Sequence, residues 1–305
     1  MLPIRQKPID NELYESLFTI QKGVTTWDHI ISFYNQKKDI WNGWIFRGQR
    51  DADWHLTTAI ERLAVEKWDL AYNKLPIIEE GLIRAFKRQF HNYSQYRPDE
   101  DDNIEWLSIM QHYGTATRLL DCTYSFYAAL FFALEKAIPN PDKMSAVWAF
   151  DSKWLYDRIL KKLDDKEKEE NDFSPFENVV TDPKKDNYFL FIRKPAISCI
   201  YPINAFKLNK RLIIQQGAFL APGDIKKSFI ENLKLITEDD KDPKEHFYLI
   251  LLPNNNKFLE DAVRELNRMN MNSATLFPGL DGFARYLNKG VIMPELIKVD
   301  ESKGT

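Results

Sequence analysis

The chain has 305 residues, of which 44% are hydrophobic and 29% are charged, with a formal net charge of −3. This composition excludes collagen-like and disordered proteins. The near balance of charge, without a long basic block, disfavours a protein that depends on nucleic-acid backbone contacts. The longest apolar run, Phe126–Leu134, is much shorter than the roughly 20 residues that span a bilayer. Since the N-terminus also lacks the apolar segment of a signal peptide, we expect a cytoplasmic protein without a membrane partner.

The first half of the chain is predicted to be mainly helical. Residues 1–25 are expected to form an N-terminal lead-in, and Thr26 or Asp28 is a suitable cap for a helix that runs to about Gln36. Further helices are expected over 75–93, 104–112 and 124–137, and extended segments over 44–46, 117–120 and 145–150.

The second half is richer in strand-like runs. Strands are predicted at 188–192, 197–201, 212–214 and 247–252, followed by a helix over 257–269 and a short helix that Asp281 would cap. A charged insertion is expected at about 158–187, and 291–305 reads as a C-terminal tail. The length allows two domains or one domain with large insertions, and the order of helices and strands predicts an α+β fold.

Arg47 follows a short apolar strand and precedes Gly48, where a side chain would obstruct a ligand. An arginine in this position suits a bidentate clamp on a phosphate or carboxylate. The alternative is a buried pair between Arg47 and a carboxylate that organises a loop. Gly48 and Gln49 belong to the same candidate ligand-binding block.

A second block of chemistry-bearing residues surrounds the predicted helix end at His112. Tyr113 is adjacent, and Arg118, Asp121 and Thr123 follow within a short distance along the chain. Such a cluster favours a functional site, although His112 could be a structural donor and Arg118 could form an internal salt bridge with Asp121.

Polar amides also interrupt the apolar run near Gln215 and Gln216, and they need partners if they are buried. Those partners could be the backbone or a ligand. Glu79 and the adjacent Glu80 are expected on a solvated helix face. Two cysteines without a CxxC motif, and five histidines without HxxxH or HxH spacing, predict no metal site. Cys122 would need a positioned base such as His112 to act as a nucleophile.

The Trp-Ile-Phe-Arg-Gly-Gln segment that begins at Trp44 resembles the signature of the FRG domain family. The match continues through Leu56–Arg62 and the QHYGTATRLLDCT segment around His112, and further blocks at 215–219 and 276–282 look similar. Two positions depart from the family pattern: Ala116 where proline is usual, and Cys122 where tryptophan is usual. The resemblance implies one FRG domain over residues 26–290.

A weaker resemblance links the same blocks to ADP-ribosyltransferases, which place an Arg or His at the end of the first core strand. It implies helices packed on a split, mostly antiparallel sheet. Arg47 would hold the pyrophosphate of NAD, Tyr113 would stack on a ring of the dinucleotide, and Thr123 would bind a ribose. Gly217 stands where that family has its catalytic glutamate, so Asp121 or His112 would have to replace it. The implied catalytic residues are His112, Asp121 and Gln215, and the implied nucleotide-binding residues are Arg47, Gly48, Gln49, Tyr113, Arg118, Thr123 and Gln216.

These resemblances predict an NAD-using enzyme, either an ADP-ribosyltransferase or an NAD hydrolase, with NAD as substrate and no metal. A macromolecular acceptor and a role as a bacterial toxin or phage-defence effector would follow from transfer chemistry. The alternative is a non-catalytic module that senses a nucleotide or a peptide with the same cleft. A third hypothesis, a nuclease using Asp121, Glu79 and His112, has no metal-spacing motif to support it.

Overall fold

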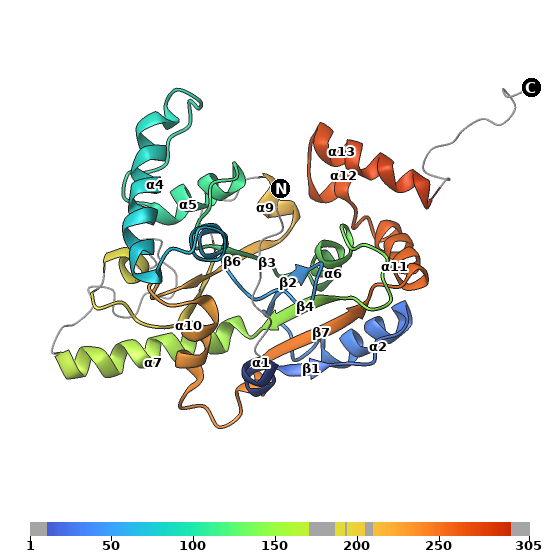
Figure 1. Cartoon of the computed structure of the whole chain (residues 1–305), viewed down its shortest axis with the longest axis horizontal. Helices are drawn as coiled ribbons and strands as arrows, with labels where there is room; N and C mark the ends of the chain where they lie inside the picture. The colour runs from blue at the N-terminus through green and yellow to red at the C-terminus, as the bar shows by residue number, and fades with distance from the viewer. Residues whose placement is uncertain (1–10, 171–186, 193, 205–209, 294–305) are drawn as a thin grey trace, which may run out of the picture.

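The computed structural model describes residues 11–170, 187–192, 194–204 and 210–293 (Figure 1). Residues 1–10 of the expected lead-in, residues 171–186 of the expected insertion and residues 294–305 of the expected tail therefore lie outside the described residues. The strands are β1 (Thr19–Gln21), β2 (Ile45–Gln49), β3 (Leu120–Thr123), β4 (Met144–Phe150), β5 (Ile200–Ile203), β6 (Gly217–Pro222) and β7 (Phe247–Pro253).

Helices lie on both sides of these strands. The α-helices are α1 (Asn11–Leu17), α2 (Trp27–Lys37), α3 (Ala59–Glu61), α4 (Leu75–Phe90), α5 (Asn103–His112), α6 (Phe126–Leu134), α7 (Ser152–Glu170), α9 (Lys210–Ile214), α10 (Phe229–Thr237), α11 (Asn256–Arg268), α12 (Ser273–Leu276) and α13 (Leu280–Leu287). Shorter helical turns are η1 (Arg62–Lys67), η2 (Tyr72–Lys74), η3 (Tyr188–Ile192), η4 (Pro243–Glu245) and η5 (Asn288–Val291).

The strands form one seven-stranded sheet in the order β1-β7-β4-β2-β3-β6-β5. The pairing of β1 with β7 is parallel, and the other pairings are antiparallel. In the middle of the sheet, β2 and β3 meet through a single registered pair, Phe46 opposite Thr123, whereas β4 and β7 pair along their whole length. The α+β class is therefore confirmed. The pairing is mostly antiparallel, as the second resemblance implied, but the described strands form one continuous sheet and not a split one.

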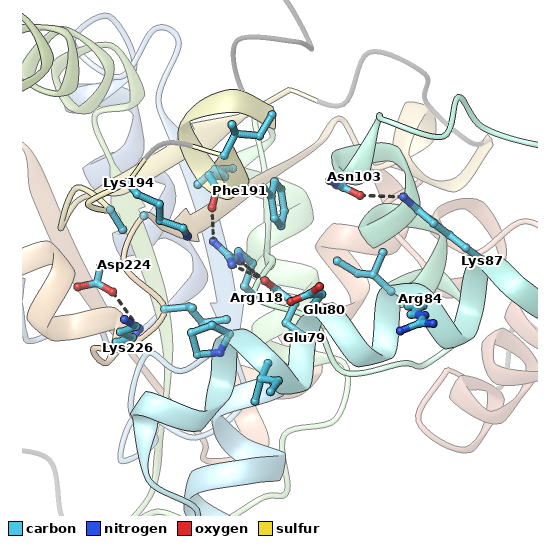
Figure 2. Close-up of a pocket in the computed structure, with 18 of the residues that line it drawn as sticks. Glu79, Glu80, Arg84, Lys87, Asn103, Arg118, Phe191, Lys194, Asp224 and Lys226 are labelled. Atoms are coloured by element: carbon cyan, nitrogen blue, oxygen red, sulfur yellow. Dashed lines mark hydrogen bonds and ion pairs between the residues drawn. The ribbon is translucent and has the colours of Figure 1, made fainter. Parts of the chain in front are cut away.

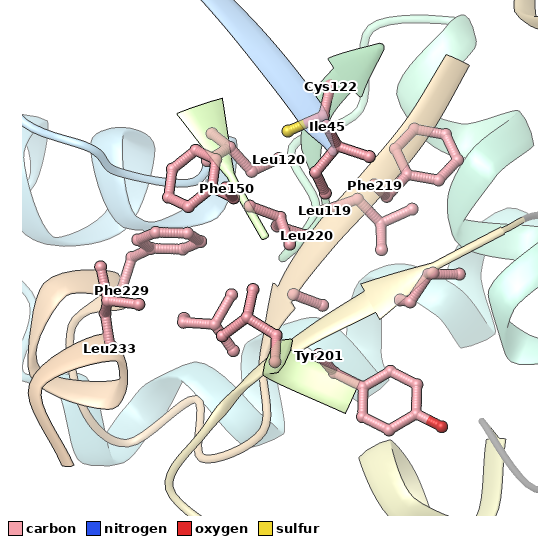
Figure 3. Close-up of a cluster of buried hydrophobic side chains, with 14 of the residues drawn as sticks. Ile45, Leu119, Leu120, Cys122, Phe150, Tyr201, Phe219, Leu220, Phe229 and Leu233 are labelled. Carbon is pink, nitrogen blue, oxygen red and sulfur yellow. The ribbon is translucent and has the colours of Figure 1, made fainter. Parts of the chain in front are cut away.

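Alternation along the central strands divides the core between the two faces of the sheet. Phe46, Val147 and Ala149 pack with α6 and α11 on one face. Ile45, Trp148 and Phe150 belong to the larger cluster on the other face, which α1, α5, α7 and α10 cover. Figure 3 shows part of this second cluster, where side chains of β3, β4 and β6 meet α10.

Two predicted strands are wrong. Residues 188–192 form the π-helical turn η3, and residues 212–214 belong to the short helix α9. Short apolar runs do not distinguish a strand from a helix by periodicity, so tertiary packing decides between them. As a result, Gln215 and Gln216 do not end a strand but connect α9 to β6, and Gln216 has a left-handed backbone with φ of 48°.

Several other expectations hold closely. Thr26 caps α2 by accepting a hydrogen bond from the His29 amide, and α4, α5, α6 and α11 lie within the predicted ranges or within one residue of them. The cap of α13 is Gly279 rather than Asp281, which lies within the first turn of that helix.

The segments expected at the edges of the domain contribute to its core. Within the lead-in, α1 buries Tyr14 and Leu17, and β1 adds an edge strand to the sheet. The start of the charged insertion is the continuous helix α7, which buries Ile159 and Leu163.

Candidate functional site

A small cleft lies where the end of α5, β3 and α9 meet. We call it the Asp121 cleft; it encloses about 50 Å³ and is lined by Ser108, Gln111, His112, Asp121, Arg211, Leu212, Gln215 and Phe219. The three residues predicted as catalytic, His112, Asp121 and Gln215, therefore line one cavity, although 103 positions separate the first from the last.

Local structure explains how these side chains meet. The Asp102 side chain caps α5, and Gly114, with φ of 90°, reverses the chain directly after the helix. The chain then enters β3, where antiparallel pairing places Asp121 opposite Phe219 of β6. Because β6 is preceded by α9, this register also brings Arg211 and Gln215 to the cleft.

Hydrogen bonds orient the Asp121 carboxylate and anchor its backbone. The Gln111 amide donates to Asp121 Oδ1 at 2.6 Å, and the buried Thr117 hydroxyl donates to Gln111 Oε1. The guanidinium of Arg47 donates from Nη1 to the Asp121 backbone carbonyl at 2.8 Å. The predicted clamp residue and the predicted catalytic carboxylate are thus neighbours across the β2–β3 junction.

Two further arginines belong to the same electrostatic environment. Burial lowers the pKa of Arg62, and the charge of Arg47 lowers it further, while Glu66, Glu61 and Asp121 act in the opposite direction. Burial likewise lowers the pKa of Arg211 at the edge of the cleft. The Nε of Arg47 is buried and has no hydrogen-bond partner among the described residues. Like charges placed close together, with a donor still unused, suit an anionic ligand.

His112 is suited to proton transfer. Its pKa is lowered from 6.5, first by partial burial and second by the charge of Arg211. The neutral imidazole, which can accept a proton, is therefore the form favoured at neutral pH. The neighbouring Tyr113 is 73% exposed and meets His112 edge to face, with ring centroids 5.0 Å apart.

Other predicted ligand-binding residues use their polar groups within the protein. Thr123 Oγ1 donates to the Gln215 carbonyl at 2.6 Å and accepts from the Ser125 amide. The Gln215 side chain donates to the Leu276 carbonyl at 2.8 Å. Gln49 is buried and donates to the Trp54 carbonyl at 2.6 Å. The buried side-chain amides of Gln49 and Gln215 therefore donate to backbone carbonyls.

Close packing against α6 explains why residue 48 is a glycine. A Cβ at Gly48 would lie 2.0 Å from the Ala129 carbonyl oxygen and 2.5 Å from the Ala133 nitrogen, both on α6. The expectation that Gly48 leaves room for a ligand is therefore corrected, since it leaves room for the helix. Gln216 is exposed, and its carbonyl accepts from the Tyr124 amide.

Arg118 does not pair with Asp121. Its guanidinium makes a bidentate ion pair with Glu79 of α4, and each side chain is only 4% exposed. The expectation that Glu79 lies on a solvated helix face is corrected too, because it balances this buried charge. Arg118 and Glu79 line a different, larger cavity, so the three residues of the nuclease hypothesis are not brought together.

The structure also bears on a nucleophilic cysteine and on a metal site. Burial raises the pKa of the Cys122 thiol to about 12, which disfavours a nucleophilic thiolate. Both cysteines are buried and free. Within the part of the chain that the structure describes, no group of three His, Cys, Asp or Glu side chains could hold a metal, and no helix is long and apolar enough to cross a membrane.

Among the polar residues in or near the cleft, Gln111, Arg62 and Arg211 were not predicted as site residues. Gln111 lies in the quoted QHYG motif, so its position beside His112 was the available signal. Arg62 ends the segment Leu56–Arg62, which carried part of the family resemblance. No sequence motif indicated Arg211 as a site residue, because the sequence predicts a strand directly after it.

Comparison with protein families agrees with the first resemblance. Residues 42–142 match the family model described as the FRG domain, a narrower range than the sequence blocks indicated. Comparison with curated proteins and with solved structures gives no match. The matched range includes every predicted site residue except Gln215 and Gln216. Residues 42–142 are therefore similar to the FRG domain, and they include most of the candidate site residues.

Proposed function

We propose that the protein is an NAD-using enzyme, an NAD hydrolase or ADP-ribosyltransferase, that cleaves the bond between nicotinamide and ribose at the Asp121 cleft. The observation that carries the proposal is the convergence of His112, Asp121 and Gln215 on one cavity beside Arg47. A carboxylate, a neutral imidazole and nearby guanidinium groups are the groups that such a reaction needs.

The chemistry assigns a task to each group. Breaking the C1′–N1 bond of NAD leaves positive charge on the ribose, which the Asp121 carboxylate would stabilise. Nicotinamide leaves with the bonding electron pair. His112 would take the proton from the attacking water or acceptor hydroxyl as its oxygen bonds to C1′. Arg47 and Arg211 would hold the diphosphate.

The absence of a glutamate at Gly217 fits this assignment to Asp121. A Cβ at Gly217 would lie 2.6 Å from Leu212 Cδ2 and 3.4 Å from the Leu212 Cα. A side chain there would require the Leu212 side chain to move, whereas the distance to the backbone of α9 is an ordinary contact. Gly217 pairs with Thr123, two residues after Asp121 on β3, so Asp121 is a carboxylate close to the missing position.

A second candidate function is a non-catalytic module that senses a nucleotide. One observation favours it: Thr123 and Gln215, which were predicted to contact the substrate, form hydrogen bonds with the backbone. The enclosed volume of about 50 Å³ is far below the ~300–1,000 Å³ typical of ligand pockets, and this constrains both functions. Most of a bound dinucleotide would have to lie outside the enclosed part of the cleft.

The substitution Asp121→Asn tests the catalytic proposal, because asparagine can still accept from Gln111 but carries no charge. We expect a loss of roughly 100-fold or more in nicotinamide release from NAD, measured by chromatography, or in transfer of labelled ADP-ribose. The matched control is Asp142→Asn, at an exposed position outside the cleft, which should keep full activity.

The outcomes separate the two functions. If the folded wild-type protein neither releases nicotinamide nor transfers label, the enzyme proposal fails. Saturable stabilisation by NAD without turnover would then support the sensing module, and the absence of any stabilisation would count against both.

The pH dependence of turnover tests the role of His112. Since burial and Arg211 lower its pKa below 6.5, the neutral base persists into mildly acidic solution. We expect kcat to rise with pH on the acidic side and to reach its plateau below the pH at which an ordinary histidine would. His112→Gln should remove this acidic limb, and a limb that survives the substitution would show that another group is the base.

Consumption of cellular NAD would suit an effector such as a toxin or a phage-defence protein that works in the cytoplasm. With a protein acceptor, the same cleft would act as a transferase. Incubation with NAD and a cell extract, followed by detection of the label, distinguishes transfer from hydrolysis.

A further inference from the structure

A second cavity, much larger than the Asp121 cleft, lies between α4, η3 and the loop from β6 to α10 (Figure 2). We call it the basic cavity; its volume is about 1230 Å³. It shares no lining residue with the Asp121 cleft. A volume above the ~300–1,000 Å³ of typical small-molecule pockets leaves ample room for a nucleotide.

Positive charge dominates the lining. The eight basic side chains outnumber the four acidic ones, although the whole chain carries a net negative charge. The basic residues are Arg84, Lys87, Arg88, Arg97, Arg118, Lys194, Lys226 and Lys227. This local reversal of sign is what attracts an anion to a cavity.

Part of this charge is already balanced. Arg118 pairs with Glu79, Lys227 pairs with Asp224 at 2.6 Å, and Arg97 pairs with Glu100. Lys87 is partly buried and donates to Asn103 Oδ1 at 2.9 Å. These contacts fix the walls of the cavity without using its other cations.

Of the eight basic side chains, Arg84, Arg88, Lys194 and Lys226 have neither an ion pair nor a side-chain hydrogen bond among the described residues. They come from three segments, with Arg84 and Arg88 one helical turn apart on α4. Figure 2 shows Arg84, Lys194 and Lys226 on different walls around the buried Arg118. Cations on several walls suit a ligand with more than one phosphate.

Apolar side chains also line the cavity. Ile77 of α4 and Ile192 of η3 are 71% and 58% exposed, so large apolar surfaces are left uncovered within the lining. Phe191, next to Ile192 in the chain, stacks with the Arg118 guanidinium, whose centre is 4.7 Å from the ring centroid. Exposed apolar side chains among several cations suit a ligand that carries a flat ring as well as phosphates.

We propose that the basic cavity is a second ligand site, which binds a nucleoside polyphosphate through its phosphates and its base. The inference does not depend on the proposed reaction at the Asp121 cleft, because the two cavities share no residue.

Calorimetric titration with ATP, inorganic tripolyphosphate and adenosine tests the proposal. We expect ATP to bind more tightly than either fragment, and its affinity to fall as salt screens the cations. The double variant Arg84→Glu/Lys226→Glu should weaken ATP binding about 100-fold, because two charge-assisted contacts become repulsive. Both side chains are exposed, so the fold should survive, and the melting temperature checks this.

Two controls locate the ligand. Lys38→Glu/Lys241→Glu makes the same change of net charge at exposed positions outside the cavity and should leave the affinity for ATP unchanged. Asp121→Asn should also leave it unchanged. Failure of the folded protein to bind ATP would overturn the proposal, as would equal loss in both charge-reversal variants. Tripolyphosphate or adenosine binding as tightly as ATP would overturn it too, and so would loss confined to Asp121→Asn.

Discussion

At the scale of single residues, the same motif can have two physical reasons, and Gly48 is the clearest case. A glycine after a strand-end arginine indicated space for a ligand, but the position that a side chain would occupy at Gly48 faces α6. Arg47 beside it still reaches the backbone of Asp121. Gly48 therefore permits close packing against α6, whereas the adjacent Arg47 contributes to the candidate site.

Gly48→Ala is expected to destabilise the protein. The added methyl group would overlap the backbone of α6, which must shift, and overpacking of this kind costs about 1–3 kcal/mol or more. The control Gly81→Ala places its methyl group in open space on α4, and the better helix propensity of alanine should leave stability unchanged or raise it. Urea denaturation measures both, and equal stability of the two variants would contradict the packing role.

At the scale of elements, polar contacts decide where α10 sits against the sheet. Asn232 is fully buried on this helix, and its Oδ1 accepts from the amides of Cys199 and Asp224. Its Nδ2 donates to the Asp224 and Ser228 carbonyls, both at 2.9 Å. One side chain thus joins the helix to the segment before β5 and the loop after β6, which forms a wall of the basic cavity.

Asn232→Ala is expected to lower the free energy of unfolding by about 2–4 kcal/mol, because two buried backbone amides lose their acceptor. Lys234→Ala, at an exposed position of the same helix, should change it by no more than about 0.5 kcal/mol. Thermal or chemical denaturation of the two variants makes the comparison, and a similar effect at both positions would show that the network contributes nothing specific.

At the scale of the whole molecule, distant segments complete one core. Phe18 lies between α1 and β1 and is 1% exposed. Its ring centroid lies 5.0 Å from that of Trp148 and 5.7 Å from that of Phe247, on the central strands β4 and β7. The N-terminal residues are therefore part of the sheet and of its packing, and not only a lead-in to it.

Phe18→Ala is expected to cost about 3–5 kcal/mol, as does removal of a buried aromatic ring from other cores. The control Phe283→Ala removes a ring that is 49% exposed and should have a small effect. Calorimetric melting of both proteins measures the difference. A mild effect at Phe18 would mean that the N-terminal segment can detach from the sheet without loss of the core.

The sequence by itself determined the class of fold and the helices α2, α4, α5, α6, α11 and α13, because apolar periods and caps such as Thr26 are local signals. It also indicated His112, Asp121 and Gln215, which carry recognisable chemistry. Only the tertiary structure decided that 212–214 is helical, that Arg118 pairs with Glu79, and that Arg211 joins the Asp121 cleft. These features depend on partners far along the chain, and the partner of a buried charge or of a short apolar run cannot be identified from local periodicity.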